Sequence, residues 1–417
     1  MKRMIPPLLP CLLLLLLLPP LAGEPAPAAD RGDDLTLKIA VIGPGNALYL
    51  WWGHISLIIE DAATGQSRLY DYGVFSFDTD NFFVNFAFGR LYYLCIVSPA
   101  GRNMAGYIAE NRDVTVYTLN LDSGHKEAVR RFVENNVRPE NRVYLYHNFR
   151  DNCATRIRDL IDLGTDGQFR GAFEQEPGRY TFRQHVRRHT WFSPFFDWAL
   201  NFWMGQNVDV PLTVWQEMFL PSEVGDRIRD FSYTAAGDAP RSLVSAVEVV
   251  NSAVGRPGVL AVPRKQWPRE LLAGLVMAAL FAAAGTGVFQ RRHPACSRVF
   301  WGLGQSALGL FLGLTGSLLF FLTFFTDHDY TWNNTNVWFV NPLLLAAIPL
   351  GILAARQNRR AQVYLRRLWR YVFIAGLAAV TVKLLPGFYQ QNQVTQALVL
   401  PIAAVLGFYK PHNEGHF

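Results

Sequence analysis

The sequence predicts an α+β domain followed by an all-α transmembrane domain of about five helices. Short segments in which apolar and polar residues alternate recur through residues 31–235, as expected for half-buried strands. Long apolar segments recur through residues 269–417, as expected for helices that span a bilayer. Residues 236–268 mix Gly, Pro, Ser and Val without a strong period, so we expect a linker there, or a small β excursion.

The N-terminus is typical of an export signal. Lys2 and Arg3 precede a short apolar run at 12–18, and small residues follow it. This order predicts a cleaved secretory signal peptide over residues 1–28, with an uncleaved anchor as the alternative. The domain at 31–235 is then expected outside the cytoplasm.

Five strands and two helices are predicted in the first domain. The strands, placed by their alternating pattern, are Leu35–Ile42, His54–Glu60, Ser67–Tyr72, Tyr92–Ser98 and Val114–Leu119. The segment 61–65 reads as a hairpin turn between the second and third of them. Helical spacing marks Lys126–Asn135 and Ala154–Leu163, and Gly164 ends the latter.

The second domain contains five apolar segments. They lie near 271–289, 299–325, 337–355, 371–385 and 394–409. The first three are long enough to cross a bilayer about 30 Å thick, which takes ~20 helical residues. The last two are short, so they are expected to be tilted spans or a re-entrant hairpin.

The distribution of charge argues against a nucleic-acid partner. The chain has a net charge of +6, but residues 24–270 carry 26 basic and 30 acidic side chains, a net of −4. Residues 271–417 carry 11 basic and 3 acidic side chains, a net of +8. Because the excess lies in the most apolar part of the chain, no basic surface for nucleic acid is expected on the first domain.

The arginines also predict the orientation of the membrane segments. Loops 290–298 and 356–370 are rich in Arg, whereas loops 326–336 and 386–393 contain no Lys or Arg. The positive-inside rule therefore places the first pair of loops in the cytoplasm. Loop 326–336 is then expected on the same side of the membrane as the first domain.

Cys153 is the candidate nucleophile. It opens the predicted helix Ala154–Leu163, and helix N-termini favour a thiolate and can stabilise an oxyanion. The other cysteine of the first domain, Cys95, lies in an apolar, strand-like run. A structural disulfide between the two remains an alternative in an oxidising compartment, as does an inert thiol at Cys153.

His54 is the best-placed general base, since it starts a strand beside Gly53. His147, six residues before Cys153, is kept as a reserve base. The strand expected to pair with that of His54 offers Asp71 or Tyr70 to orient the imidazole. No pair of His or Cys has zinc spacing, so neither a metal nor another cofactor is expected.

Several stretches of the chain match one known family. They are Trp52-Gly53-His54, 72–75, 110–112, 151–159, 180–183, 209–211, 218–221, 324–328 and 336–342. With them the sequence resembles the Bacteroidota-type lipoprotein N-acyltransferase family, over roughly residues 36–409. The resemblance implies a circularly permuted papain-like (NlpC/P60-like) fold for the first domain. His147 departs from the pattern, because a non-basic polar residue is expected there.

The resemblance also implies a reaction and its partners. Cys153 would take an acyl chain from a phospholipid as a thioester, and the N-terminal amine of a diacylglyceryl-cysteine lipoprotein would receive it. His54 would transfer the protons, and Asn152 is a possible accessory residue. The protein is then expected as a multi-pass protein of the bacterial inner membrane, with its catalytic domain in the periplasm.

A polar cluster at the predicted membrane edge is a further candidate for substrate binding. Asp327, His328, Asn336 and Trp338 fall on the side of the membrane expected for Cys153. They are hypothesised to bind a lipid head group or to complete the acceptor site. A simple interfacial cap is the alternative.

Two other functions stay open at this stage. The same cysteine and histidine would serve a phospholipid deacylase or a peptidoglycan amidase. A non-enzymatic membrane sensor or binding protein, with Cys95 and Cys153 joined as a disulfide, is the second possibility.

Overall fold

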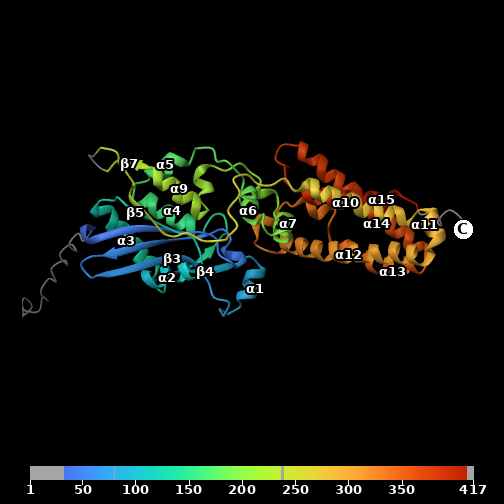
Figure 1. Cartoon of the computed structure of the whole chain (residues 1–417), viewed down its shortest axis with the longest axis horizontal. Coiled ribbons are helices and arrows are strands. Elements are labelled where there is room, and N and C mark those ends of the chain that lie inside the picture. The colour runs from blue at the N-terminus through green and yellow to red at the C-terminus, as the bar shows by residue number, and fades with distance from the viewer. Residues whose placement is uncertain (1–31, 79, 236–238, 411–417) are drawn as a thin grey trace, which may run out of the picture.

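The computed structural model describes residues 32–78, 80–235 and 239–410. The predicted signal peptide at 1–28 lies outside these residues. The molecule is elongated, with a mixed α/β sheet domain at one end and a bundle of helices at the other (Figure 1).

The centre of the first domain is a seven-stranded antiparallel sheet with the order β6-β4-β3-β2-β1-β5-β9. Its strands are β1 (Leu35–Ile42), β2 (His54–Asp61), β3 (Gln66–Val74), β4 (Leu91–Pro99), β5 (Val114–Leu119), β6 (Val143–Tyr146) and β9 (Val244–Asn251). The first five agree closely with the alternating segments of the sequence. Strand β9 shows that part of the segment 236–268 is a β excursion, which pairs with β5 at the edge of the sheet.

Helices cover both faces of the sheet. The helices α3 (Ser123–Asn136), α4 (Cys153–Leu163) and α9 (Pro221–Asp230) pack on one face and bury the larger core with Leu57 and Tyr70. The helix α2 (Ala100–Ala109) packs on the other face, over a smaller core that includes Ile58 and Leu69. Since successive strand residues point to opposite faces, each strand contributes to both cores.

Further short elements complete the chain outside these layers. They are α1 (Phe82–Ala87), α5 (Gln168–Phe173), α6 (Phe182–Thr190), α7 (Pro194–Trp203), α8 (Val214–Glu217), the paired strands β7 (Ser232–Tyr233) and β8 (Arg241–Ser242), and the 3-10 helices Gly32–Asp34, Leu48–Leu50, Gln206–Val208, Asp329–Thr331, Thr335–Trp338, Pro342–Ala346 and Val382–Leu384. Helices α6 and α7 lie between the sheet and the bundle, and α1 lies at the end of the sheet domain nearest the bundle (Figure 1).

The bundle contains α10 (Trp267–Ala284), α11 (Gly287–Arg292), α12 (Pro294–Phe325), α13 (Ala347–Ala355), α14 (Arg359–Thr381) and α15 (Gln393–Phe408). Within the described residues, three helical segments are long and apolar enough to span a membrane: Trp267–Ala284, Pro294–Phe325 and Thr335–Ala355. Helix α15 packs against both α10 and α14. It has only 16 residues, as the short fifth apolar segment led us to expect.

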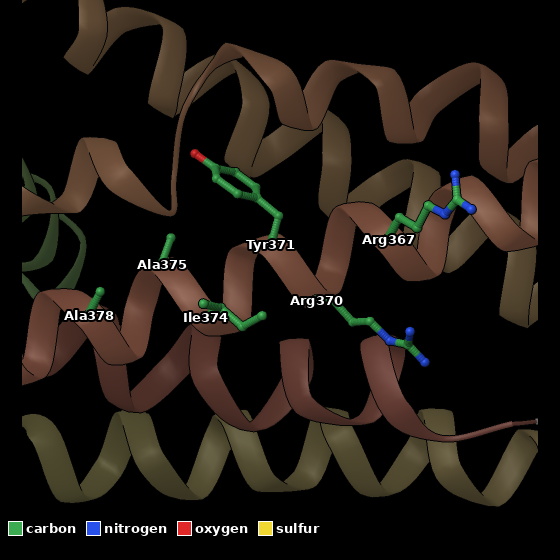
Figure 2. Close-up of a pocket in the computed structure, with 6 residues that line it drawn as sticks. All are labelled: Arg367, Arg370, Tyr371, Ile374, Ala375 and Ala378. Atoms are coloured by element: carbon green, nitrogen blue, oxygen red, sulfur yellow. The ribbon is translucent and has the colours of Figure 1, made fainter.

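Helix α14 begins with arginines and continues with small and apolar residues. Figure 2 shows a shallow hollow along this helix, lined by Arg367, Arg370, Tyr371, Ile374, Ala375 and Ala378. All six residues come from one helix of the bundle. The hollow is therefore a feature of the membrane domain and separate from the sheet that carries the predicted catalytic residues.

Candidate active site

Cys153 is the first residue of α4, and a capping box fixes that end of the helix. The Asn152 side chain accepts a hydrogen bond from the Thr155 N–H at 2.9 Å, and the Thr155 hydroxyl accepts one from the Asn152 N–H at 2.8 Å. The capping box uses the N–H of Thr155, the third residue of the helix, and the first turn of a helix has further N–H groups without a partner inside the helix. Cys153 itself is only 8% exposed.

His54 is the first residue of β2 and faces Asp71 on the neighbouring strand β3. Its Nε2 lies 2.5 Å from Oδ1 of Asp71, and the histidine side chain is 18% exposed. The Ser56 hydroxyl also donates to the same carboxylate oxygen, at 3.4 Å. Because Nε2 is engaged by Asp71, Nδ1 is the ring nitrogen that remains for proton exchange.

The register of the sheet distinguishes Asp71 from Tyr70. Leu57 pairs with Tyr70, and continuing this register places Ser56 opposite Asp71. Asp71 therefore shares a face with His54 and Ser56, whereas Tyr70 points into the larger core on the opposite face. Of the two residues proposed to orient the imidazole, the structure brings only Asp71 to it.

Gly73 allows α4 to approach this end of the sheet. It has φ of +84° and lies at an irregularity in the pairing of β3 with β4. A Cβ placed on it would lie 3.8 Å from Cβ of Cys153 and 3.2 Å from the ring of Tyr146. The missing side chain thus gives Cys153 access to the strand end where His54 begins.

The electrostatics of the site favour a charged imidazole. Burial acts to lower the pKa of His54, but the Asp71 carboxylate and then Cys153 outweigh it, so the pKa is raised well above its ordinary value. A protonated His54 next to Cys153 stabilises a thiolate and can later return the proton to a leaving group. The arrangement is therefore suited to nucleophilic acyl chemistry.

Cys95 lies in β4 and has a different environment. Cys95, Cys153 and Cys296 are all free thiols among the residues that the structure describes. Burial raises the pKa of the Cys95 thiol to about 12, and Cys95 packs in the larger core beside Tyr72. A thiol in such surroundings is protonated and inert at neutral pH.

Two family models match this chain. Residues 27–188 match the model described as Lnb N-terminal periplasmic domain, and residues 271–410 match the Lnb transmembrane domain. The two matches are consistent with the Lnb lipoprotein N-acyltransferase family. The chain is therefore a membrane protein with a periplasmic domain, and the Lnb domains indicate a protein that modifies lipoproteins. Comparisons with curated proteins and with solved structures gave no match.

His147, the reserve base, joins the Lnb periplasmic domain to the Lnb transmembrane domain. Its Nδ1 accepts hydrogen bonds from the N–H groups of Phe149 and Arg150, both at 3.1 Å. Its Nε2 therefore carries the proton and donates to Asp329, at 2.8 Å. Both ring nitrogens are thus occupied by structural contacts. Asn152 is similarly engaged, since its amide donates to the carbonyls of Asn148 and Phe219.

The four polar residues at the edge of the Lnb transmembrane domain do not form one cluster. His328 is buried, donates from Nε2 to the Phe86 carbonyl at 3.0 Å and accepts from the Tyr330 hydroxyl at 2.6 Å. Asp327 is exposed and pairs with Arg90 at 3.0 Å. These two residues hold the loop that follows α12 against α1 and the segment after it.

The remaining two residues lie elsewhere on that loop. Asn336 is fully buried, and its amide donates to the Phe202 carbonyl at the end of α7. Trp338 is partly exposed, and its carbonyl accepts a hydrogen bond from the Tyr371 hydroxyl at 2.7 Å. Asn336 thus attaches this loop of the transmembrane domain to α7, which lies between the two matched Lnb ranges.

Two neighbours of the candidate site were not anticipated from the sequence. Tyr107 on α2 lies with its ring centroid 6.4 Å from that of His54, and Tyr146 at the end of β6 lies over Gly73 beside Cys153. Tyr107 sits in a helix and Tyr146 in a four-residue strand, neither of which was predicted. Among the described residues, no group of three His, Cys, Asp or Glu side chains is arranged to hold a metal ion.

Proposed function

We propose that this protein is a cysteine-dependent N-acyltransferase that completes lipoproteins at the periplasmic face of the bacterial inner membrane. The observation that carries the proposal is the juxtaposition of Cys153, at the first turn of α4, with the His54–Asp71 pair on β2 and β3. The two Lnb domains support the choice of substrate class, because they suggest a membrane protein that modifies lipoproteins.

In the first half of the reaction, Cys153 takes an acyl chain from a phospholipid. The thiol proton passes to His54, and Sγ attacks the carbonyl carbon of an ester. The oxyanion is stabilised by the free N–H groups at the start of α4. As the C–O bond breaks, His54 protonates the glycerol oxygen, which leaves as a lysophospholipid, and a thioester remains on Cys153.

In the second half, the amine of the lipoprotein resolves the thioester. The α-amino nitrogen of a diacylglyceryl-cysteine attacks the thioester carbonyl, and His54 accepts the proton that the nitrogen loses. The C–S bond then breaks, the proton returns to sulfur, and the acyl chain leaves as an amide. Asp71 keeps the imidazole oriented and favours its charged form in both halves.

The thioester is the intermediate to test. Purified full-length protein in detergent is mixed with phospholipid carrying isotope-labelled acyl chains and analysed by mass spectrometry. We expect a hydroxylamine-sensitive acyl adduct on Cys153 in the wild type and in Cys95→Ala, and none in Cys153→Ala. Cys95→Ala is the matched control because it removes the other thiol of the domain. A wild type with no adduct on Cys153 would contradict the thioester route.

A second step separates transfer from hydrolysis. A synthetic peptide with an N-terminal diacylglyceryl-cysteine is added to the acylated protein. If the protein transfers the acyl chain, the label should move to the peptide amine, and the adduct on Cys153 should disappear at the same rate. Release of free fatty acid with the peptide unchanged would instead identify a phospholipid deacylase.

A further inference from the structure

An unusual series of aromatic side chains leads from the surface of the molecule toward Cys153. We call it the aromatic strip, and it consists of Phe75, Phe77, Phe82, Phe83, Phe86, Tyr93 and Tyr146. The proposed reaction gives these residues no role. Their arrangement has an outer end on α1 and an inner end at the candidate site.

The outer end of the strip is exposed. Phe83 is 69% exposed, and Phe77, Val84 and Phe86 are exposed as well. These side chains belong to α1 and the turn before it, so one short segment presents a concentrated apolar surface. A surface of this kind on a protein marks contact with another apolar phase or molecule.

The same end is attached to the periplasmic end of a candidate membrane span. Phe88 stacks edge-on against Phe321 of α12 with ring centroids 5.7 Å apart, and its carbonyl accepts a hydrogen bond from Asp327 at 2.8 Å. Beyond this contact, Phe324 and Phe325 at the end of α12 are exposed. The exposed phenylalanines of α1 therefore continue the apolar surface with which α12 faces the bilayer.

The inner end of the strip reaches the candidate nucleophile. Phe82 stacks on Phe75 at 5.7 Å, Phe75 stacks on Tyr93 at 4.9 Å, and Tyr93 contacts Tyr146 at 4.4 Å, all between ring centroids. Tyr146 lies over Gly73, next to the side chain of Cys153. The rings thus connect the membrane-facing surface to the site without a charged side chain among them.

We propose that α1 is inserted in the periplasmic leaflet and that the aromatic strip carries the acyl chain of a phospholipid from the bilayer to Cys153. The inference rests on the proposed function for its substrate and specifies how that substrate arrives. The occupant is an acyl chain because the strip is uncharged and continuous with the bilayer-facing surface of α12. Arg90, which follows α1 and pairs with Asp327, marks the polar boundary of this surface.

Photocrosslinking tests the path directly. Full-length Cys153→Ala protein, which cannot form the thioester, is reconstituted in phosphatidylcholine–phosphatidylglycerol vesicles that contain a phospholipid with a diazirine on one acyl chain. After illumination, we expect adducts within residues 75–93 and at 143–146. Introducing Phe83→Glu should reduce these adducts by about tenfold, because a carboxylate is excluded from hydrocarbon.

Phe132→Glu is the matched control. Phe132 is also exposed, at 46%, but it lies on α3, on the part of the sheet domain away from the bundle (Figure 1). This variant should leave the adducts unchanged. Adducts that are missing from the strip in the parent protein, or an equal loss in both variants, would overturn the proposal.

A kinetic comparison separates access from chemistry. With Cys153 intact, Phe83→Glu should slow thioester formation from vesicle phospholipid about tenfold and leave acylation by a short, water-soluble ester at the wild-type rate. Equal slowing with both donors would contradict a role in lipid access. If the wild type is acylated by neither donor, the proposed function fails, and the crosslinks alone then decide whether α1 and the strip contact acyl chains.

Discussion

At the scale of single residues, the candidate site depends on which face of β3 each side chain occupies. Asp71 contacts His54, while its neighbour Tyr70 is buried on the opposite side of the sheet. The sequence narrowed the choice to these two residues but could not decide between them. A slip of one residue in strand register exchanges the two faces, and the predicted turn at 61–65 did not fix the register to that precision.

Replacing Asp71 by Asn tests its effect on His54. Asp71 raises the pKa of His54, so the imidazole stays charged to higher pH than an ordinary histidine. Without the carboxylate the pKa of His54 falls. As the pH rises, the imidazole then loses its proton at a lower pH than in the wild type, and the charged ring that supplies the leaving-group proton is lost earlier. We expect thioester formation to slow on the order of 10²-fold, and the alkaline limb of its pH–rate profile to move to lower pH.

The conservative variant Ser56→Ala serves as the control for Asp71→Asn. The hydrogen bond from Ser56 to the same carboxylate is long, at 3.4 Å, so its removal should leave the alkaline limb in place. An unchanged limb in Asp71→Asn, measured by quenched-flow acylation over the neutral and alkaline range, would show that Asp71 does not set the protonation of His54.

At the scale of elements, the strands with clear alternation were predictable and the short or irregular elements were not. Strand β6 has four residues at a sheet edge, too few for a pattern to emerge. Helix α1 begins at Phe82, and the residue before it, Asn81, has φ of +57° and makes no capping hydrogen bond with its side chain, so the helix lacks the usual start signal. These two elements form the two ends of the aromatic strip, and for this reason the strip could not be predicted from sequence patterns.

The cap of α4 should affect both stability and chemistry. Asn152→Ala removes the acceptor for the Thr155 N–H and leaves the carbonyls of Asn148 and Phe219 without their donor. We expect the free energy of unfolding to fall by about 0.5–2 kcal/mol. Thermal denaturation of the protein in detergent measures this loss. We also expect slower acylation, because the first turn of α4 holds Cys153.

Thr181→Ala is the matched control, since Thr181 forms the equivalent capping box at the start of α6. It should cost similar stability but leave acylation at the wild-type rate. Asn152→Ser, which retains a capping oxygen, should restore much of the activity of Asn152→Ala. A stable Asn152→Ser protein without activity would instead indicate that Asn152 contacts the substrate.

At the scale of the whole molecule, loops of the membrane domain bind the carbonyl end of α7. The Asn334 amide donates to the carbonyls of Phe202, Trp203 and Met204, and Gln390 donates to Met204 as well. Sequence patterns predicted the membrane segments, and three of them qualify as spans. They could not predict these contacts, because the partners lie more than 100 residues apart and follow no local period.

Asn334→Ala should loosen this connection without altering the candidate site. We expect faster hydrogen exchange at 200–205 and slower acylation of Cys153 from vesicle phospholipid, while a short soluble ester reacts at the wild-type rate. The control is Asn333→Gly, which tolerates the local φ of +53° and removes only a bond to Asn207. Equal rates of hydrogen exchange at 200–205 in the wild type, Asn334→Ala and Asn333→Gly would show that Asn334 does not hold the domains together.

The packing of α15 against α10 has a consequence for the biogenesis of the protein. A Cβ on Gly274 of α10 would lie 2.6 Å from the Leu398 carbonyl of α15, so the first and last helices of the bundle are in direct backbone contact. Gln390, which binds the end of α7, lies three residues before the start of α15 at Gln393. Because α15 follows the other helices of the bundle in the chain, its contacts with α10 form only after those helices have been synthesised. The bond from Gln390 to the carbonyl end of α7 is therefore made late in biogenesis, after the helices that precede α15 have been synthesised.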